Sequence, residues 1–252
     1  EMAKQREVFE SGAKNQGVDP ELAIKIFDLV EKFAGYGFNK SHSAAYAIVS
    51  YQTAWLKAHY PAHFMAATMS SDMDKTDKVV TFIEECRTMK LKLLPPDVNS
   101  GEFHFTVDDA GNIIYGLGAI KGSGQQAVEA VVAARTAGGP FTSLFDFCAR
   151  IDRSKVNRRC VDALIKAGAF DSITPNRAAL LASTELAYDY ADLQEANAGQ
   201  AGLFDMGDES FHGSSQHEPE LIDTMPWGVK ERLSLEKSAI GFFLSGHLFD
   251  ES

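Results

Sequence analysis

Cysteine is scarce in this sequence, and long apolar runs are missing. The three cysteines, Cys86, Cys148 and Cys160, are far apart and show no Cys-x-x-Cys spacing. This excludes a disulfide framework or zinc ribbon and favours buried thiols in a reducing compartment. No run of about 18 apolar residues occurs, so we expect no membrane-spanning helix and no membrane partner. No basic, apolar leader follows Glu1, so we expect no secretory signal and a cytoplasmic location.

Basic charge is also in short supply, with 24 Lys and Arg against 35 Asp and Glu and a net charge of −11. The deficit lies wholly in residues 171–252, which hold 4 basic and 15 acidic side chains, whereas residues 1–170 hold 20 of each. Within that neutral part, residues 112–170 carry 8 basic and 4 acidic side chains. A weakly basic middle permits contact with phosphate, while an acidic tail is repelled by DNA and suits a protein partner.

Apolar periodicity predicts helices through roughly the first ninety residues. Asp19-Pro20-Glu21 is typical of a helix start, with a capping side chain followed by proline and an acid in the first turn. Two apolar stripes at helical spacing follow, one before residue 35 and one between residues 41 and 60. The residues that form them are Leu22, Ile26, Leu29 and Phe33 in the first stripe and Ile48, Tyr51, Trp55 and Ala58 in the second, which we expect to be buried.

The middle of the chain differs in kind. Pro95-Pro96 halts any regular element. Two apolar strands at 103–107 and 112–115 flank an Asp- and Gly-rich turn, which predicts a β-hairpin. Helices are predicted at about 123–136, 142–150, 154–167 and 176–197, followed by a polar linker from 196 to 223 and an ordered piece from 227 to 244.

The turn at residues 35–40 and the helix after it form a candidate anion site. Ser41 is a plausible cap, and the helix start offers unpaired amides beside the charge of Lys40. His42 and Tyr46 share one helix face. A glycine-rich helix connection with a capping serine explains the same residues without any ligand.

The sequence Gly-Tyr-Gly-Phe-Asn-Lys-Ser-His-Ser-Ala-Ala-Tyr at 35–46 closely resembles the fingers of bacterial DNA polymerase III alpha subunits, which are C-family replicative polymerases. The resemblance continues at 50–61, 94–99, 115–122 and 164–171. In that family the fingers pack over the nascent base pair. The resemblance therefore implies that Tyr36, Asn39, Lys40 and His42 lie near the incoming nucleotide and its template partner.

The glycines at 116–124 resemble those of nucleotide-binding loops, but their spacing excludes both common types of loop. Lys121 stands where a dinucleotide fold requires its third glycine, and no Gly-Lys-Ser or Gly-Lys-Thr is present. Glycines that let backbone amides approach a phosphate instead predict a helix-hairpin-helix turn, which the family has here. Ordinary helix caps are an equally good explanation from the residues alone. The candidate contacts with the DNA backbone are Gly118, Lys121, Gly122, Ser123 and Gly124.

Lys155, Arg158 and Arg159 open the helix that follows, and we expect them to contact DNA phosphates. A solvated basic face is the competing interpretation. In the acidic linker, Gln200-x-x-Leu203-Phe204 resembles the short peptide by which bacterial polymerases hold the sliding clamp. Exposure of Leu203 and Phe204 to water is unfavourable, so we expect this pair to bind either the clamp or, alternatively, the chain's own domain.

The chain contains no candidate catalytic residue and no candidate metal site. Asp72-x-Asp74 has the spacing of a two-metal pair, but it lies between two helices, where helix capping explains it. The resemblance implies a parent nucleotidyltransferase, a DNA-directed DNA polymerase, whose catalytic aspartates and Mg²⁺ lie in a palm outside this chain, so we expect the chain alone to be inactive. The implied partners are primer-template DNA, an incoming dNTP, the sliding clamp (beta subunit) and other replicase subunits.

These inferences predict a mainly α fold, with a helical fingers subdomain, a helix-hairpin-helix module carrying a small β-hairpin, and an acidic flexible linker. The expected divisions are 1–95 for the fingers, 96–175 for the DNA-binding module, 176–215 for a helix and the linker with the clamp peptide, and 216–252 for a connection towards an OB domain. Two alternatives stay open: a non-catalytic module that binds DNA and recruits the clamp, and a structural helical adaptor.

Overall fold

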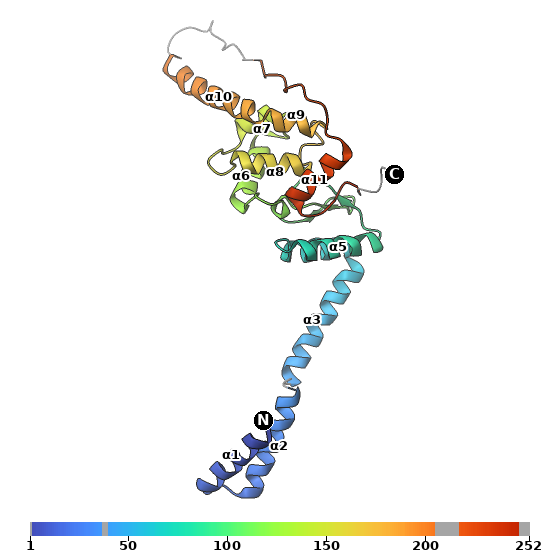
Figure 1. The fold of residues 1–252 in the computed structure, drawn as a ribbon, viewed down its shortest axis with the longest axis vertical. Helices are drawn as coiled ribbons and strands as arrows, with labels where there is room; N and C mark the ends of the chain where they lie inside the picture. Colours follow the sequence, from blue (N-terminus) through green and yellow to red (C-terminus); the bar gives the residue numbers. More distant parts are fainter. Residues whose placement is uncertain (1, 37–39, 205–216, 247–252) are drawn as a thin grey trace. The chain divides into compact units, whose positions relative to one another are not determined.

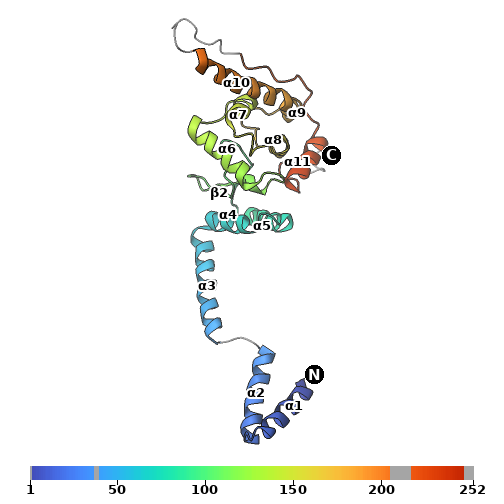
Figure 2. The same ribbon diagram turned by 90° about the vertical axis from the view of Figure 1, so that its left-hand side faces the viewer.

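The computed structural model describes residues 2–36, 40–204 and 217–246. The chain divides into two compact units, Glu1–Ala58 and His59–Ser252. Figures 1 and 2 show the course of the chain through both units. The mainly α fold predicted from the sequence is confirmed.

The first unit contains α1 (Met2–Asn15), α2 (Pro20–Tyr36) and most of α3 (Lys40–His59). The predicted start of α2 is confirmed, because the amide of Glu21 donates to Oδ1 of Asp19 at 2.8 Å. Helices α1 and α2 pack against each other through Phe9 and Phe27, whose ring centroids are 5.5 Å apart.

The prediction that the apolar stripes of this unit are buried is wrong. In α2 the buried side chains are Ala23 and Phe27, while Leu29 is 68% exposed. In α3 the expected stripe is exposed as well, and Tyr51 is 69% exposed. A helical period identifies an apolar face, but burial of that face needs a packed neighbour, and α1 covers only a narrow strip of α2.

The second unit is built from eight helices, a 3₁₀ turn and three short strands among the residues that the structure describes. In chain order these are α4 (Pro61–Ser71), α5 (Thr76–Thr88), β1 (Leu93–Leu94), β2 (Thr106–Val107), β3 (Ile113–Ile114), the 3₁₀ turn Leu117–Ala119, α6 (Gln125–Gly138), α7 (Leu144–Arg150), α8 (Arg158–Ala167), α9 (Arg177–Ala182), α10 (Thr184–Phe204) and α11 (Val229–Ile240).

The predicted hairpin is present as β2 and β3, which pair antiparallel. Its turn is closed by Asp108, whose Oδ1 accepts from the amides of Ala110 at 3.0 Å and Asn112 at 2.8 Å. Strand β1 adds to the other side of β3 in parallel, so the sheet has the order β1-β3-β2. The parallel third strand was not predicted.

One hydrophobic core joins this sheet to the surrounding helices. Phe147 is fully buried near its centre, with its ring 4.8 Å from that of Phe141 and 4.9 Å from that of Phe170. Helix α10 packs on α7, and α11 packs on α8. Figures 1 and 2 show α6 to α9 and α11 gathered around this core.

Two helix boundaries differ from the sequence prediction. The helix predicted over 154–167 begins only at Arg158, because Asn157 caps it. The helix predicted over 176–197 is divided at Ser183, whose buried hydroxyl accepts from the amide of Ile222 at 2.8 Å. Its second part, α10, continues to Phe204, so residues 196–204 are helical where a linker was predicted.

Candidate nucleic-acid interface

Two helix starts line one groove of about 670 Å³ in the second unit. One side is the glycine turn before α6, and the other is the end of the loop that leads into α8. We call this the hairpin groove. Its lining residues are Gly122, Gly124, Gln125, Gln126, Ala127, Glu129, Lys155, Asn157 and Cys160. The fold thus brings together three of the predicted DNA-contacting residues, Gly122, Gly124 and Lys155.

The glycine turn that lines this groove has backbone amides without hydrogen-bond partners among the described residues. Gly122 has φ of +93°, which is in the region that favours glycine, and Gly124 caps α6 without a side-chain hydrogen bond. Within the part of the chain that the structure describes, the amides of Gly122 and Gly124 have no hydrogen-bond partner. Open amides at a helix start, together with the positive end of the helix dipole, form an environment that attracts anions.

Ser123 stabilises this turn from inside. Its side chain is buried, and its hydroxyl lies 2.5 Å from the carbonyl oxygens of both Leu117 and Ile120. Gly118 is also a packing residue, since a Cβ there would lie 2.5 Å from the ring of Phe103. Neither residue lines the groove, although both were predicted to contact the DNA backbone.

Lys121 lies on the side of the turn that faces α11. Its amide donates to the carbonyl of Ala239 at 2.8 Å, at the end of that helix. Its Nζ lies 3.3 Å from the position that a Cβ on Gly241 would occupy. Lys121 is exposed but does not line the groove.

The start of α8 supplies the positive charge. Asn157 caps this helix, accepting from the amide of Cys160 at 3.0 Å. Lys155 pairs with Asp152 at 2.9 Å, and Arg158 pairs with Glu185 at 3.4 Å. Arg159 is exposed and makes no ion pair with any residue in the described ranges. The basic charge is therefore partly offset by acidic neighbours.

The loop before α8 has a defined internal structure. Hydrogen bonds from the Ser154 hydroxyl and the Lys155 ammonium lower the pKa of Asp152 to about 2. The amides of Lys155 and Val156 both donate to the Asp152 carbonyl, at 3.0 and 2.9 Å. Sequence reasoning identified the lysine here but not the turn that presents it.

The candidate nucleotide-proximal residues lie in the first unit. Asn39 is outside the described residues, as are the side chains of Tyr36 and Lys40, which end α2 and begin α3. The expected shared face of His42 and Tyr46 is confirmed, because their rings stack with centroids 4.3 Å apart. A helix ends and another begins at this turn, but α3 begins at Lys40, so Ser41 lies inside the helix and the prediction that it caps α3 is wrong.

The predicted clamp peptide falls on the last turn of α10. The backbone there is helical through Phe204, whereas the side chains of Gln200, Leu203 and Phe204 lie outside the described residues.

The Asp-x-Asp pair has a simple structural role. The carboxylate of Asp72 forms an ion pair with Lys75 at 2.5 Å. The prediction that Asp72 caps the following helix through its side chain is wrong, because α5 has no side-chain cap. Across residues 2–36, 40–204 and 217–246, no group of three or more His, Cys, Asp and Glu side chains is placed to hold a metal ion. Over the same ranges, no helix combines the length and apolar character that crossing a membrane requires.

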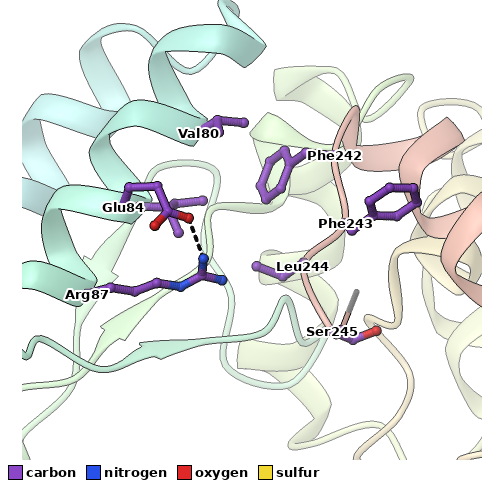
Figure 3. A pocket seen from close by; sticks show the side chains of 9 residues that line it. Val80, Glu84, Arg87, Phe242, Phe243, Leu244 and Ser245 are labelled. Atoms are coloured by element: carbon purple, nitrogen blue, oxygen red, sulfur yellow. Dashed lines mark hydrogen bonds and ion pairs between the residues drawn. The ribbon is translucent and has the colours of Figure 1, made fainter. Parts of the chain in front are cut away.

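Sequence reasoning missed a second hollow, of about 480 Å³, between α5 and the turn after α11. Figure 3 shows Phe242 and Leu244 pointing toward α5, while Phe243 points away. Glu84 and Arg87 form an ion pair on the α5 side. The residues come from segments about 160 positions apart, so no local pattern indicated that they meet.

Comparisons with known proteins confirm the resemblance. A model of the helix-hairpin-helix motif matches residues 90–180, which include the whole hairpin groove. The chain is 55% identical over 250 residues to the DNA polymerase III subunit alpha of Neisseria meningitidis serogroup B, covering 99% of this chain and 21% of that protein. It is 56% identical over 247 residues to the same subunit of Escherichia coli K12, covering 98% and 21%. The chain thus spans about a fifth of the length of these relatives.

Proposed function

Because the whole chain is similar to one segment of bacterial DNA polymerase III alpha subunits, we propose that it serves as a DNA-handling segment of a cytoplasmic replicative DNA polymerase. The parent enzyme would transfer nucleotides from dNTPs to a primer with Mg²⁺ held by carboxylates outside this chain. The chain itself would supply contacts to DNA and to the other replicase subunits.

We assign the hairpin groove to the sugar-phosphate backbone of duplex DNA. The observation that supports this assignment is that two helix starts line one groove, with Gly122 and Gly124, whose amides have no partner among the described residues, on one wall and Lys155 on the other. Amides and ammonium groups bind phosphate oxygens without regard to base identity. Such a contact suits a polymerase that copies any template.

The residues of this region then take different roles. Gly122, Gly124 and Lys155 contact phosphate directly, and Arg158 and Arg159 add charge at the start of α8. Ser123 and Gly118 hold the turn in shape through their buried contacts. Lys121 reaches DNA that extends past the groove on the α11 side.

The fingers and clamp assignments rest on the resemblance to the polymerase family. Tyr36, Asn39, Lys40 and His42 would lie near the incoming dNTP and its template base. The stacked pair of His42 and Tyr46 offers an aromatic surface suited to that place. Gln200, Leu203 and Phe204 would bind the sliding clamp.

The groove assignment is tested by duplex binding at several salt concentrations. A substitution that removes one basic side chain from a phosphate should lower the slope of log affinity against log salt by about one. We expect this decrease in Lys155→Ala and in Arg159→Ala. Arg87→Ala is the matched control, because this exposed arginine lies on α5 beside Glu84 and away from the groove. Equal slopes in all three variants and the unaltered chain would contradict the assignment, and absence of binding would favour a structural adaptor.

A further inference from the structure

We propose that Arg153 is a positioning residue for DNA binding, because it ties the loop at residues 151–157 to helix α10 and so sets the wall of the hairpin groove. We call this segment the α7–α8 loop. The proposal rests on the function proposed for the groove. Lys155 and Asn157, at the end of the loop, line the groove, whereas Arg153 does not.

Arg153 is the least exposed member of a three-residue ion cluster. Its side chain is 18% exposed, while those of Asp192 and Glu195 on α10 are 72% and 79% exposed. The two terminal nitrogens of its guanidinium divide between these carboxylates, and one of them also lies 3.4 Å from the Tyr188 carbonyl. A planar guanidinium that binds two partners on one helix fixes direction as well as distance.

A second contact joins the same loop to the same helix. The hydroxyl of Tyr188 donates to the carbonyl of Val156 at 2.9 Å, and the Val156 side chain is fully buried. The loop is thus held to α10 at positions 153 and 156, on either side of the lysine that lines the groove. Helix α10 in turn packs on α7.

This arrangement makes the position of the groove lysine depend on α10. The Lys155 side chain itself forms one ion pair, with the exposed Asp152, and its amide takes part in the local turn. A single exposed pair of this kind restrains a chain weakly, whereas the guanidinium of Arg153 binds two carboxylates and lies close to a carbonyl of the same helix. Without the tie at Arg153, the loop gains freedom, and ordering it again on DNA lowers affinity.

The first test compares duplex binding by the chain and by its Arg153→Ala variant. We expect the Kd to rise about fivefold, as the removal of two exposed ion pairs allows. The salt slope should stay unchanged, because Arg153 does not itself touch phosphate. A slope lowered by about one would overturn the inference, since it would show that Arg153 contacts DNA directly.

Charge exchange provides a rescue that a merely destabilising substitution would not show. Arg153→Glu should weaken binding, and Asp192→Lys with Glu195→Lys should restore it when added to that variant. The two lysine substitutions alone are the control, because they add positive charge without a partner. The two lysine substitutions should raise affinity more in the Arg153→Glu variant than in the chain that keeps Arg153. An equal rise in both would overturn the inference.

Amide hydrogen exchange separates this inference from the proposed function. The amides of Lys155 and Val156 donate to the Asp152 carbonyl, and their exchange should accelerate in Arg153→Ala without DNA. Unchanged exchange in a chain that binds duplex would overturn the positioning role alone. Absence of duplex binding by the unaltered chain would overturn the proposed function, whatever the exchange rates.

Discussion

Removal of the buried guanidinium of Arg177 should destabilise the second unit severely. Arg177 is 6% exposed and bonds two carboxylates, those of Asp171 at 2.5 Å and Glu236 at 3.3 Å. Glu236 is 1% exposed and also accepts from the amides of Leu244 at 2.6 Å and Ser245 at 2.8 Å. This cluster ties α9 to α11 and to the turn that follows α11.

The expected loss of stability in Arg177→Ala is about 3–5 kcal/mol, because the substitution leaves the Glu236 carboxylate buried without its cation. Glu236→Gln is the matched comparison. Its amide oxygen still accepts from the two backbone amides, and Arg177 keeps Asp171, so we expect a loss of only about 1–2 kcal/mol. The difference between the two variants measures the cost of an unpaired buried charge.

Urea unfolding at pH 7 measures both values. In a Trp55→Phe background, Trp227 is the remaining tryptophan and reports on the second unit, since it precedes α11 directly. The linear extrapolation then gives the free energy of unfolding for each variant. A loss below about 1 kcal/mol in Arg177→Ala, or equal losses in the two variants, would refute the reasoning.

Three further predictions concern the same unit. Gly168→Ala should cost at least about 1 kcal/mol in urea unfolding, because Gly168 has φ of +86° and a Cβ there would lie 2.2 Å from the buried guanidinium described above. The Asp152 carboxyl should titrate near pH 2 by NMR, and Ser154→Ala should raise the pKa of Asp152. Because folding lowers this pKa, the contribution of Asp152 to stability is complete above about pH 4 and is lost as the pH falls through 2. Cys148 and Cys160 should resist alkylation at pH 8 until the chain unfolds, because burial raises their pKa to about 12 and about 11; rapid labelling of the native chain would contradict this.

Local chemistry made the hairpin and the glycine turn predictable. Asp108 accepts hydrogen bonds from amides two and four positions later, and Gly111 has φ of +83°. Gly122 likewise has a positive φ just before a helix. In each case the residues that form the structure are neighbours in the chain, so their pattern indicates the conformation directly.

The apolar stripes of the first unit show where periodicity stops being informative. Helix α2 carries apolar residues on most of its circumference, including exposed Ile24 and Val30 beside buried Phe27. The spacing therefore predicted a helix but not which strip packs on α1. That choice depends on the few large side chains of α1, chiefly Phe9.

Side-chain direction in the candidate site was only partly predictable for the same reason. Gly122, Gly124 and Lys155 meet in the groove, but Lys121 turns toward α11 because its amide binds Ala239, which is more than one hundred residues away in sequence. The partners of Arg153 lie 39 and 42 positions downstream. Contacts at such separations arise from packing, and a single sequence carries no local sign of them.

Amide NMR spectra of the chain, recorded as a short DNA duplex is added, test the central claim most directly. The largest shifts should fall on the amides of Gly122, Gly124 and Gln125 and on Lys155 at the opposite wall, and they should disappear at high salt. Shifts confined to other surfaces, with these amides unmoved at saturating duplex, would contradict the account.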